Sequence, residues 1–159
     1  MLRRLTIVLL TLGAAAATLP AAAAPVFPPG LRIGLEPPGN LKPSARFAGF
    51  EDADRKVAVT ILDLPAAAFS QLERAATAPQ AGSANVRRED FALSGGSGLL
   101  FTAQTQVNGV AVHKWILLAT AAADKDLTAI IDFELPESAL SFYSDAVVCN
   151  AQASVTFHP

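Results

Sequence analysis

The surroundings of His113 are where this sequence could most readily do chemistry. His113 lies within an expected strand, and Asp132 or Glu134 from a later strand could approach its imidazole to form a triad or a metal site. The chain has one other histidine, the penultimate His158, so ligands for a zinc ion are scarce. A structural His113, hydrogen-bonded to Gln104, is the favoured interpretation, because buried imidazoles are usually satisfied by neighbouring groups.

Three further motifs do not meet the requirements of a functional site. Gly95-Gly96-Ser97-Gly98 precedes a strand and lacks the lysine of a phosphate loop, and Ser97 lacks the Gly-x-Ser-x-Gly elbow of a hydrolase. The acidic cluster Glu51-Asp52-Asp54 lacks the spacing and the glycine of a calcium loop. Cys149 is the single cysteine and cannot form an internal disulfide, so we expect either a buried, inert thiol or an intermolecular disulfide bridge. The sequence therefore predicts no catalytic residue, no cofactor and no metal.

A hairpin at Asn108-Gly109 is expected to position His113. This dipeptide is a strong turn signal, because both central residues of a type I′ turn need positive φ. If the loop has two residues, Val107 pairs with Val110, and the register of every pair beyond them is fixed.

This register assigns the side chains of the hairpin to two faces. The apolar face is expected to be core; its members are Leu99, Phe101, Val112, Ile116 and Leu118. The other face is amphipathic, so it should cover a helix or line a groove, and it is the candidate binding face. Its members form two opposite pairs, Thr102 with Trp115 and Gln104 with His113. Trp115 itself is favoured as a packing residue, because aromatic side chains dominate protein cores.

Hydrophobic periodicity outlines the remaining elements. Alternating apolar residues predict further strands, whereas Pro65 and Pro136 are each suited to the first position of a helix. Strands interrupted by two helices indicate an α+β fold, with an antiparallel β-sheet sandwiched by helices. The expected strands are 31–35, 46–51, 57–61, 86–93, 99–107, 110–118 and 127–135, with a short extended tail at 153–157 that could pair with the sheet edge.

The first residues have the three parts of a secretory signal peptide. Arg3 and Arg4 precede an apolar run, 5–12, and an alanine-rich stretch then supplies small residues for cleavage, which we expect after Ala23. An uncleaved anchor is the alternative, although the strongly apolar run is short for a membrane span. The adjacent arginines also permit a twin-arginine signal, although the ordinary secretory route is favoured. The predicted organisation is a signal peptide at 1–23 and one α+β domain at 24–159, periplasmic or secreted in a Gram-negative bacterium.

The charge of the predicted mature domain excludes some partners. Removing Arg3 and Arg4 from 12 basic residues leaves 10 against 14 acidic ones, which changes the net charge from −2 to −4. A basic footprint for nucleic acid is absent, and a mildly acidic surface has no electrostatic attraction to anionic lipids. We therefore expect no nucleic acid and no membrane span after cleavage. The predicted partner class is another periplasmic or envelope protein.

Three segments resemble short exported bacterial proteins of the PsbP type. The segments are Leu31-x-Ile33-x-Leu35-x-Pro37-Pro38-Gly39, Phe47-x-Gly49-Phe50-Glu51 and Lys114-Trp115-Ile116-Leu117-Leu118. The resemblance covers most of the chain from Gly30 onward and implies a PsbP-like sandwich. Its motifs are structural, so no catalytic residue carries over. Proteins of that fold act mainly as accessory or protein-binding modules, so the resemblance favours such a role without establishing it.

Two hypotheses for the function follow. The favoured one is an exported periplasmic accessory or binding module without catalytic activity. The alternative is a small periplasmic hydrolase or ligand-binding enzyme with a groove near His113, on the face of Gln104 and Trp115.

Overall fold

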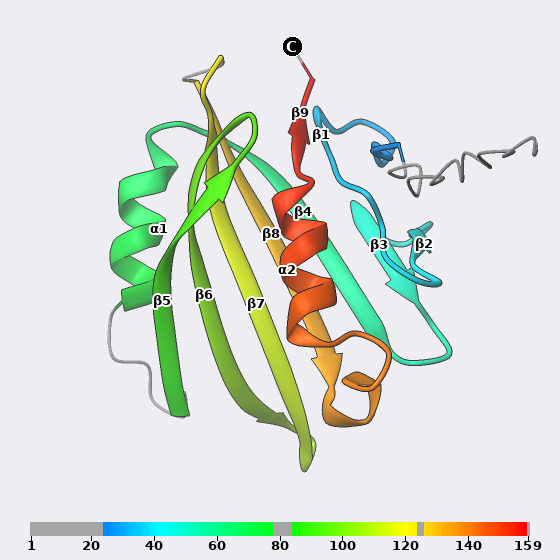
Figure 1. Ribbon diagram of the computed structural model, residues 1–159. Helices are drawn as coiled ribbons and strands as arrows, with labels where there is room; N and C mark the ends of the chain where they lie inside the picture. Colours follow the sequence, from blue (N-terminus) through cyan, green and yellow to red (C-terminus); the bar gives the residue numbers. More distant parts are fainter. Residues whose placement is uncertain (1–23, 78–83, 124–125, 159) are drawn as a thin grey trace, which may run out of the picture.

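The computed structural model describes residues 24–77, 84–123 and 126–158, so the predicted signal peptide at 1–23 lies outside the described residues. Its centre is a seven-stranded antiparallel sheet with the order β2-β3-β4-β8-β7-β6-β5 (Figure 1). The strands of this sheet are β2 (Lys42–Pro43), β3 (Gly49–Asp52), β4 (Val57–Pro65), β5 (Ala84–Leu93), β6 (Gly96–Val107), β7 (Val110–Ala121) and β8 (Leu127–Pro136).

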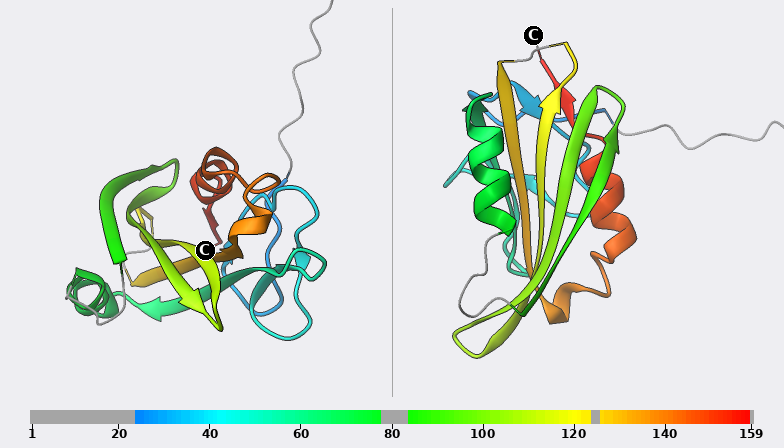
Figure 2. Two further views of the ribbon diagram at one scale, coloured as in Figure 1. Left: turned by 90° about the horizontal axis from the view of Figure 1, so that it is seen from below. Right: turned by 90° about the vertical axis from the view of Figure 1, so that its left-hand side faces the viewer.

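One helix packs on each face of this sheet. Helix α1 (Ala68–Thr77) follows β4, and helix α2 (Asp145–Ala153) lies on the opposite side (Figure 2, right). A single turn of 3-10 helix, η1 (Glu137–Ala139), joins β8 to the segment before α2. The predicted fold class, an α+β protein with an antiparallel sheet sandwiched by helices, is confirmed.

The hairpin register is the one that Asn108-Gly109 predicts. Both residues have positive φ, 52° at Asn108 and 78° at Gly109, and Val107 pairs with Val110. Counting outward, Thr102 lies opposite Trp115 and Gln104 opposite His113, as expected. The turn chemistry therefore determines the face on which each hairpin side chain lies.

Both faces of the sheet bury apolar side chains, but the larger core lies on the face that was expected to be only amphipathic. Trp115 and Phe133 pair across β7 and β8 and pack there with Val148 of α2. The face that was expected to be core holds a smaller cluster under α1. That cluster consists of Leu99, Phe101 and Leu118, packed by Phe69, Leu72 and Ala76 of the helix.

The two prolines end strands instead of beginning helices. Pro65 still pairs with Leu127 at the end of β4, and α1 begins at Ala68. Pro136 likewise ends β8, and α2 begins only after Ser144, whose hydroxyl accepts a hydrogen bond from the Val147 amide at 3.4 Å. In both places the strand pairing continues through the proline, so the helix starts later than the sequence predicts.

The first and the last strand of the described residues form a small second sheet. Strand β9 (Thr156–Phe157) pairs with β1 (Ile33–Gly34), beside α2 (Figure 1). The expected pairing of the tail with the edge of the large sheet is therefore wrong. The buried side chains of Ile33 and Leu35 close the core on the α2 face from this side.

A buried carboxylate ties the segment before α2 to the turn between β3 and β4. Asp52 is 4% exposed, and it accepts hydrogen bonds from the Tyr143 hydroxyl at 2.7 Å and from Arg55 Nη1 at 3.1 Å. The bond from Tyr143 is the largest cause of the lowered pKa of Asp52. Burial, followed by the bond to Asp52, raises the pKa of Tyr143 to about 12. The predicted acidic cluster at 51–54 is thus partly structural.

Replacing Tyr143 with phenylalanine should destabilise the fold. The substitution keeps the packed ring but leaves a buried carboxylate short of one donor, so we expect the free energy of unfolding to fall by about 1–3 kcal/mol at neutral pH. Because the folded-state pKa of Asp52 is lowered, the stabilisation exists above the unfolded-state value and is lost as the pH falls through the folded-state value. Urea denaturation at neutral and acidic pH should show the difference shrinking in acid.

The exposed Asp54 in the same turn provides the control. Asp54→Asn should leave the free energy of unfolding unchanged. Equal stabilities for Tyr143→Phe and the wild type would contradict the structural role of the Asp52 contact.

Candidate functional site

The four residues of the predicted binding face come together in one shallow groove. Thr102, Gln104, His113 and Trp115 line it with Arg87 and Asp145, in a volume of about 360 Å³. Trp115, however, is only 5% exposed, and its Nε1 donates to Asp145 Oδ1 at 2.7 Å. Its packing role, and not a ligand contact, explains where it lies.

His113 has weak contacts within this groove. Its Nε2 lies 3.4 Å from Gln104 Nε2, which is a long distance for a hydrogen bond, and its ring stacks on Trp115 with 6.0 Å between centroids. Asp132 and Glu134 lie on the other face of the sheet, because they pair with Ile116 and Lys114 while His113 pairs with Leu135. The triad or metal site that the sequence allowed is not assembled.

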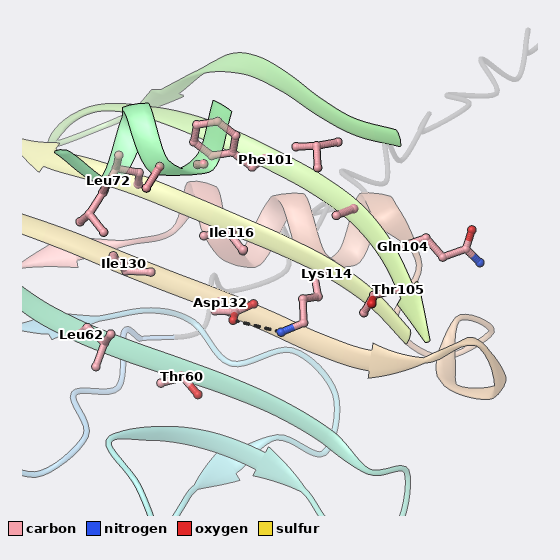
Figure 3. Close-up of a pocket in the computed structure, with 15 residues that line it drawn as sticks. Thr60, Leu62, Leu72, Phe101, Gln104, Thr105, Lys114, Ile116, Ile130 and Asp132 are labelled. Atoms are coloured by element: carbon pink, nitrogen blue, oxygen red, sulfur yellow. Dashed lines mark ion pairs between the residues drawn. The ribbon is translucent and has the colours of Figure 1, made fainter. Parts of the chain in front are cut away.

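A larger groove lies on the opposite face, and we call it the α1-face groove. Its volume is about 560 Å³, and its walls are predominantly apolar. Figure 3 shows its side chains on β4, β8, β7 and β6, with Leu72 of α1 at one end and the Lys114–Asp132 pair towards the other. Its lining residues include five large apolar side chains and one carboxylate, namely Leu62, Leu72, Phe101, Ile116, Ile130 and Asp132.

The groove exists because α1 is too short to cover the sheet. A helix of 10 residues spans about 15 Å, whereas a strand of 12 residues such as β6 or β7 spans about 40 Å. On the other face, α2 is joined by the N-terminal segment and by the segment around Tyr143, which together complete the larger core. On the α1 face, the end of the sheet beyond the helix remains open.

One cation and two carboxylates occupy this open end. Lys114 Nζ lies 2.6 Å from Glu134 Oε2 and 3.8 Å from Asp132 Oδ2. The three side chains are between 27% and 41% exposed. The second oxygen of Asp132, Oδ1, is buried and has no hydrogen-bond partner among the described residues. Asp132 is therefore the less well compensated carboxylate of the two.

The electrostatics agree with this geometry. Burial raises the pKa of Asp132, the nearby Glu134 adds to the rise, and Lys114 only partly opposes it. Burial alone would lower the pKa of Lys114, but the hydrogen bond to Glu134 and the two negative charges outweigh it, so its pKa is raised. Lys114 thus stays charged, while the charged form of Asp132 is disfavoured.

The sequence contained a signal for the α1-face groove that reasoning about His113 did not use. Ile130, Asp132 and Glu134 alternate with the buried residues of β8, so they share the face opposite Ile131 and Phe133. An apolar residue followed on the same face by two carboxylates indicates a sheet face that other elements cover only in part. The extent of the groove depends on the placement of α1, which the alternation does not determine.

Comparisons with known proteins show the fold. No family model and no curated protein matches the chain. A crystal structure from Bacteroides thetaiotaomicron matches with a TM-score of 0.54 and 8% identity over 87% of this chain; the chain spans about half, 49%, of that protein. LpqN of Mycobacterium tuberculosis, described as involved in cell envelope biogenesis, matches with a TM-score of 0.51 and 16% identity, over 86% of this chain and 90% of LpqN.

Two features are absent from the described residues. Within 24–77, 84–123 and 126–158, no helix combines the length and apolarity that a membrane span requires. In the same ranges, no three histidine, cysteine, aspartate or glutamate residues gather as a metal-binding group.

We expect Asp132→Asn to stabilise the protein at neutral pH. Asparagine is uncharged, so the cost of a buried, partly unpaired charge disappears, and the gain should be about 1 kcal/mol, the lower end of the cost of an unsatisfied group. Since the folded-state pKa of Asp132 is raised, its contribution to stability is greatest in acid and is lost as the pH rises through that value. The advantage of the variant should therefore shrink as the pH falls.

Thermal unfolding across a pH series measures this effect. Asp90→Asn, at an exposed carboxylate on the same face, should show no advantage at any pH. A destabilised Asp132→Asn variant at neutral pH would contradict the view that Asp132 is poorly compensated.

His113→Ala should cost little stability. The ring is partly exposed and its hydrogen-bond contact with Gln104 is long, so the free energy of unfolding should fall by less than about 1 kcal/mol, as for surface side chains. Chemical denaturation tests this expectation. A loss of several kcal/mol would show that His113 stabilises the fold through contacts stronger than those described above.

Proposed function

We propose that this protein is a non-catalytic binding module of the bacterial envelope, periplasmic or secreted, which holds a small molecule with an apolar body in the α1-face groove. The observation that carries the proposal is the groove itself, an open apolar surface with one polar end. Ligand sites in proteins are usually concave and mostly apolar, with a few polar groups that orient the ligand.

The envelope address is supported by two independent features. The predicted signal peptide at 1–23 would export a domain at 24–159, and LpqN, with which the chain shares its fold, is described as involved in cell envelope biogenesis. The resemblance to PsbP-type proteins, which itself remains a prediction, also favours a binding role, because proteins of that kind act mainly as accessory modules. A periplasmic or envelope protein remains the proposed partner class.

Geometry favours a binding role over the hydrolase alternative. The groove near His113 is small, its Trp115 is occupied by packing, and Asp132 and Glu134 lie across the sheet from the imidazole. The α1-face groove is lined by one carboxylate, one lysine and two threonines, but by no serine, cysteine or histidine among its described lining residues. Such a set can orient a ligand, and it lacks the histidine base of a Ser-His-Asp triad.

Filling the α1-face groove should abolish binding of an apolar probe. Ala103 lines the groove beside Lys114, so Ala103→Trp places a large ring in the space that a ligand would occupy. We expect the wild type to bind the neutral dye Nile red with a fluorescence increase, and the variant to bind it at least about tenfold more weakly, as expected when a ligand pocket is blocked.

Ala111 provides the matched control. It is a half-buried alanine on the neighbouring strand, and it faces the opposite side of the sheet. Ala111→Trp should bind Nile red as the wild type does, and circular dichroism should show that both variants are folded. Equal binding by wild type and Ala103→Trp, or the absence of any binding, would contradict the proposal.

A further inference from the structure

We propose that the ligand of the α1-face groove is an elongated apolar molecule with one protonated amine, and that Asp132 accepts a hydrogen bond from this amine. The inference rests on the proposed function of the groove and adds the chemical class of the ligand.

The apolar part of the ligand is determined by the floor and wall of the groove. Ile116 and Ile130 are diagonal neighbours on the adjacent strands β7 and β8. Phe101 and Leu62 continue this surface towards the outer strands, and Leu72 of α1 closes one end (Figure 3). Leu62 is 44% exposed, so this part of the apolar surface is open to water. An extended hydrocarbon chain lying across these side chains would remove them from water.

The head group of the ligand is determined by the charges at the open end. Lys114 together with Asp132 and Glu134 carries a net negative charge, and Lys114 lies closer to Glu134 than to Asp132. Asp132 Oδ1 is buried without a partner among the described residues and the side chain is 27% exposed, so a group that approaches this carboxylate from the groove is best matched if it donates a hydrogen bond. A protonated amine supplies both the donor and the missing positive charge.

Other head groups fit less well. A carboxylate or phosphate would approach two carboxylates, and the one lysine is already paired with them. A hydroxyl would donate to Asp132 but would leave its charge uncompensated. Hydrogen bonds to charged groups are about twice as strong as neutral ones, so the ammonium should be preferred over the hydroxyl.

Few charged side chains face the groove itself. Of the described residues that line the groove, Lys114 and Asp132 are the charged ones; β4 contributes Thr60 and Leu62, and β6 contributes Ala103 and Thr105 beside them. Arg88 of β5 forms an ion pair with Glu73 of α1 at 2.6 Å, and neither residue lines the groove. Glu134 lies outside the groove lining and lines an adjoining pocket with Asp54, Arg55 and Lys56. The charge that faces the groove is therefore set by Lys114 and Asp132, and Lys114 pairs more closely with Glu134 than with Asp132.

Three ligands of equal chain length test the inference. Decylammonium, decanol and decanoate share one apolar body and differ only in the head group, and isothermal titration calorimetry on the full exported protein at neutral pH gives their affinities. We expect decylammonium to bind about tenfold more tightly than decanol, a difference of about 1.4 kcal/mol, and decanoate to bind most weakly.

Substitution of Asp132 tests the named contact. Asp132→Asn should bring decylammonium to within about twofold of decanol while decanol itself stays nearly unchanged, because the amide retains the polar surface without the charge. This variant is expected to be folded and more stable than the wild type. Asp90→Asn, an exposed carboxylate on the same face but outside the groove, should keep the full preference for the amine.

The outcomes separate this inference from the function on which it rests. If decanol binds, and Ala103→Trp abolishes its binding, but decanoate binds as tightly as decylammonium, the amine assignment is wrong and the binding role stands. If the Asp132→Asn variant keeps the preference for the amine, Asp132 is not its acceptor. If none of the three ligands binds, the proposed binding role itself fails.

Discussion

The register of β6, β7 and β8 is the constraint on which the rest of the structure depends. The turn at Asn108-Gly109 fixes the register of β6 with β7, β8 pairs with β7 in its own register, and the two-residue period of a strand then assigns each side chain to a face. Trp115 and Phe133 are thereby packed against α2, while Lys114 and Asp132 are turned to the other side. A slip by one residue would bury the ion pair and expose the main core.

The two faces of the sheet are covered unequally, and the groove that we propose as a ligand site lies on the less covered face. On the α2 face, the N-terminal strand, the segment held by the Asp52–Tyr143 hydrogen bond and α2 itself close a continuous core. On the α1 face, a short helix leaves part of the sheet open, with an incompletely paired carboxylate at its end. Such a carboxylate costs stability in the unliganded protein, which is typical of residues kept for binding and not for folding.

Local chemistry was enough to predict part of this structure. The Asn108-Gly109 turn gave the hairpin and its pairs, and the alternation from Leu127 to Leu135 placed β8 with its buried face, because both signals act over a few residues. The main core and the helix starts were less predictable. Whether Pro65 ends a strand or begins a helix depends on pairing with β8, a distant segment, and the α1-face groove depends on where a short helix packs.

A ligand bound in the proposed α1-face site is expected to leave the α2 face unchanged. Two adjacent residues of β8 report on the two faces, because Ile130 lines the α1-face groove whereas Ile131 is buried in the core beneath α2. Methyl NMR of isoleucine-labelled protein during a decylammonium titration measures both at once. The account predicts saturable shifts at Ile130 and Ile116 and a nearly constant Ile131 signal; shifts at Ile131 with Ile130 unchanged would contradict it.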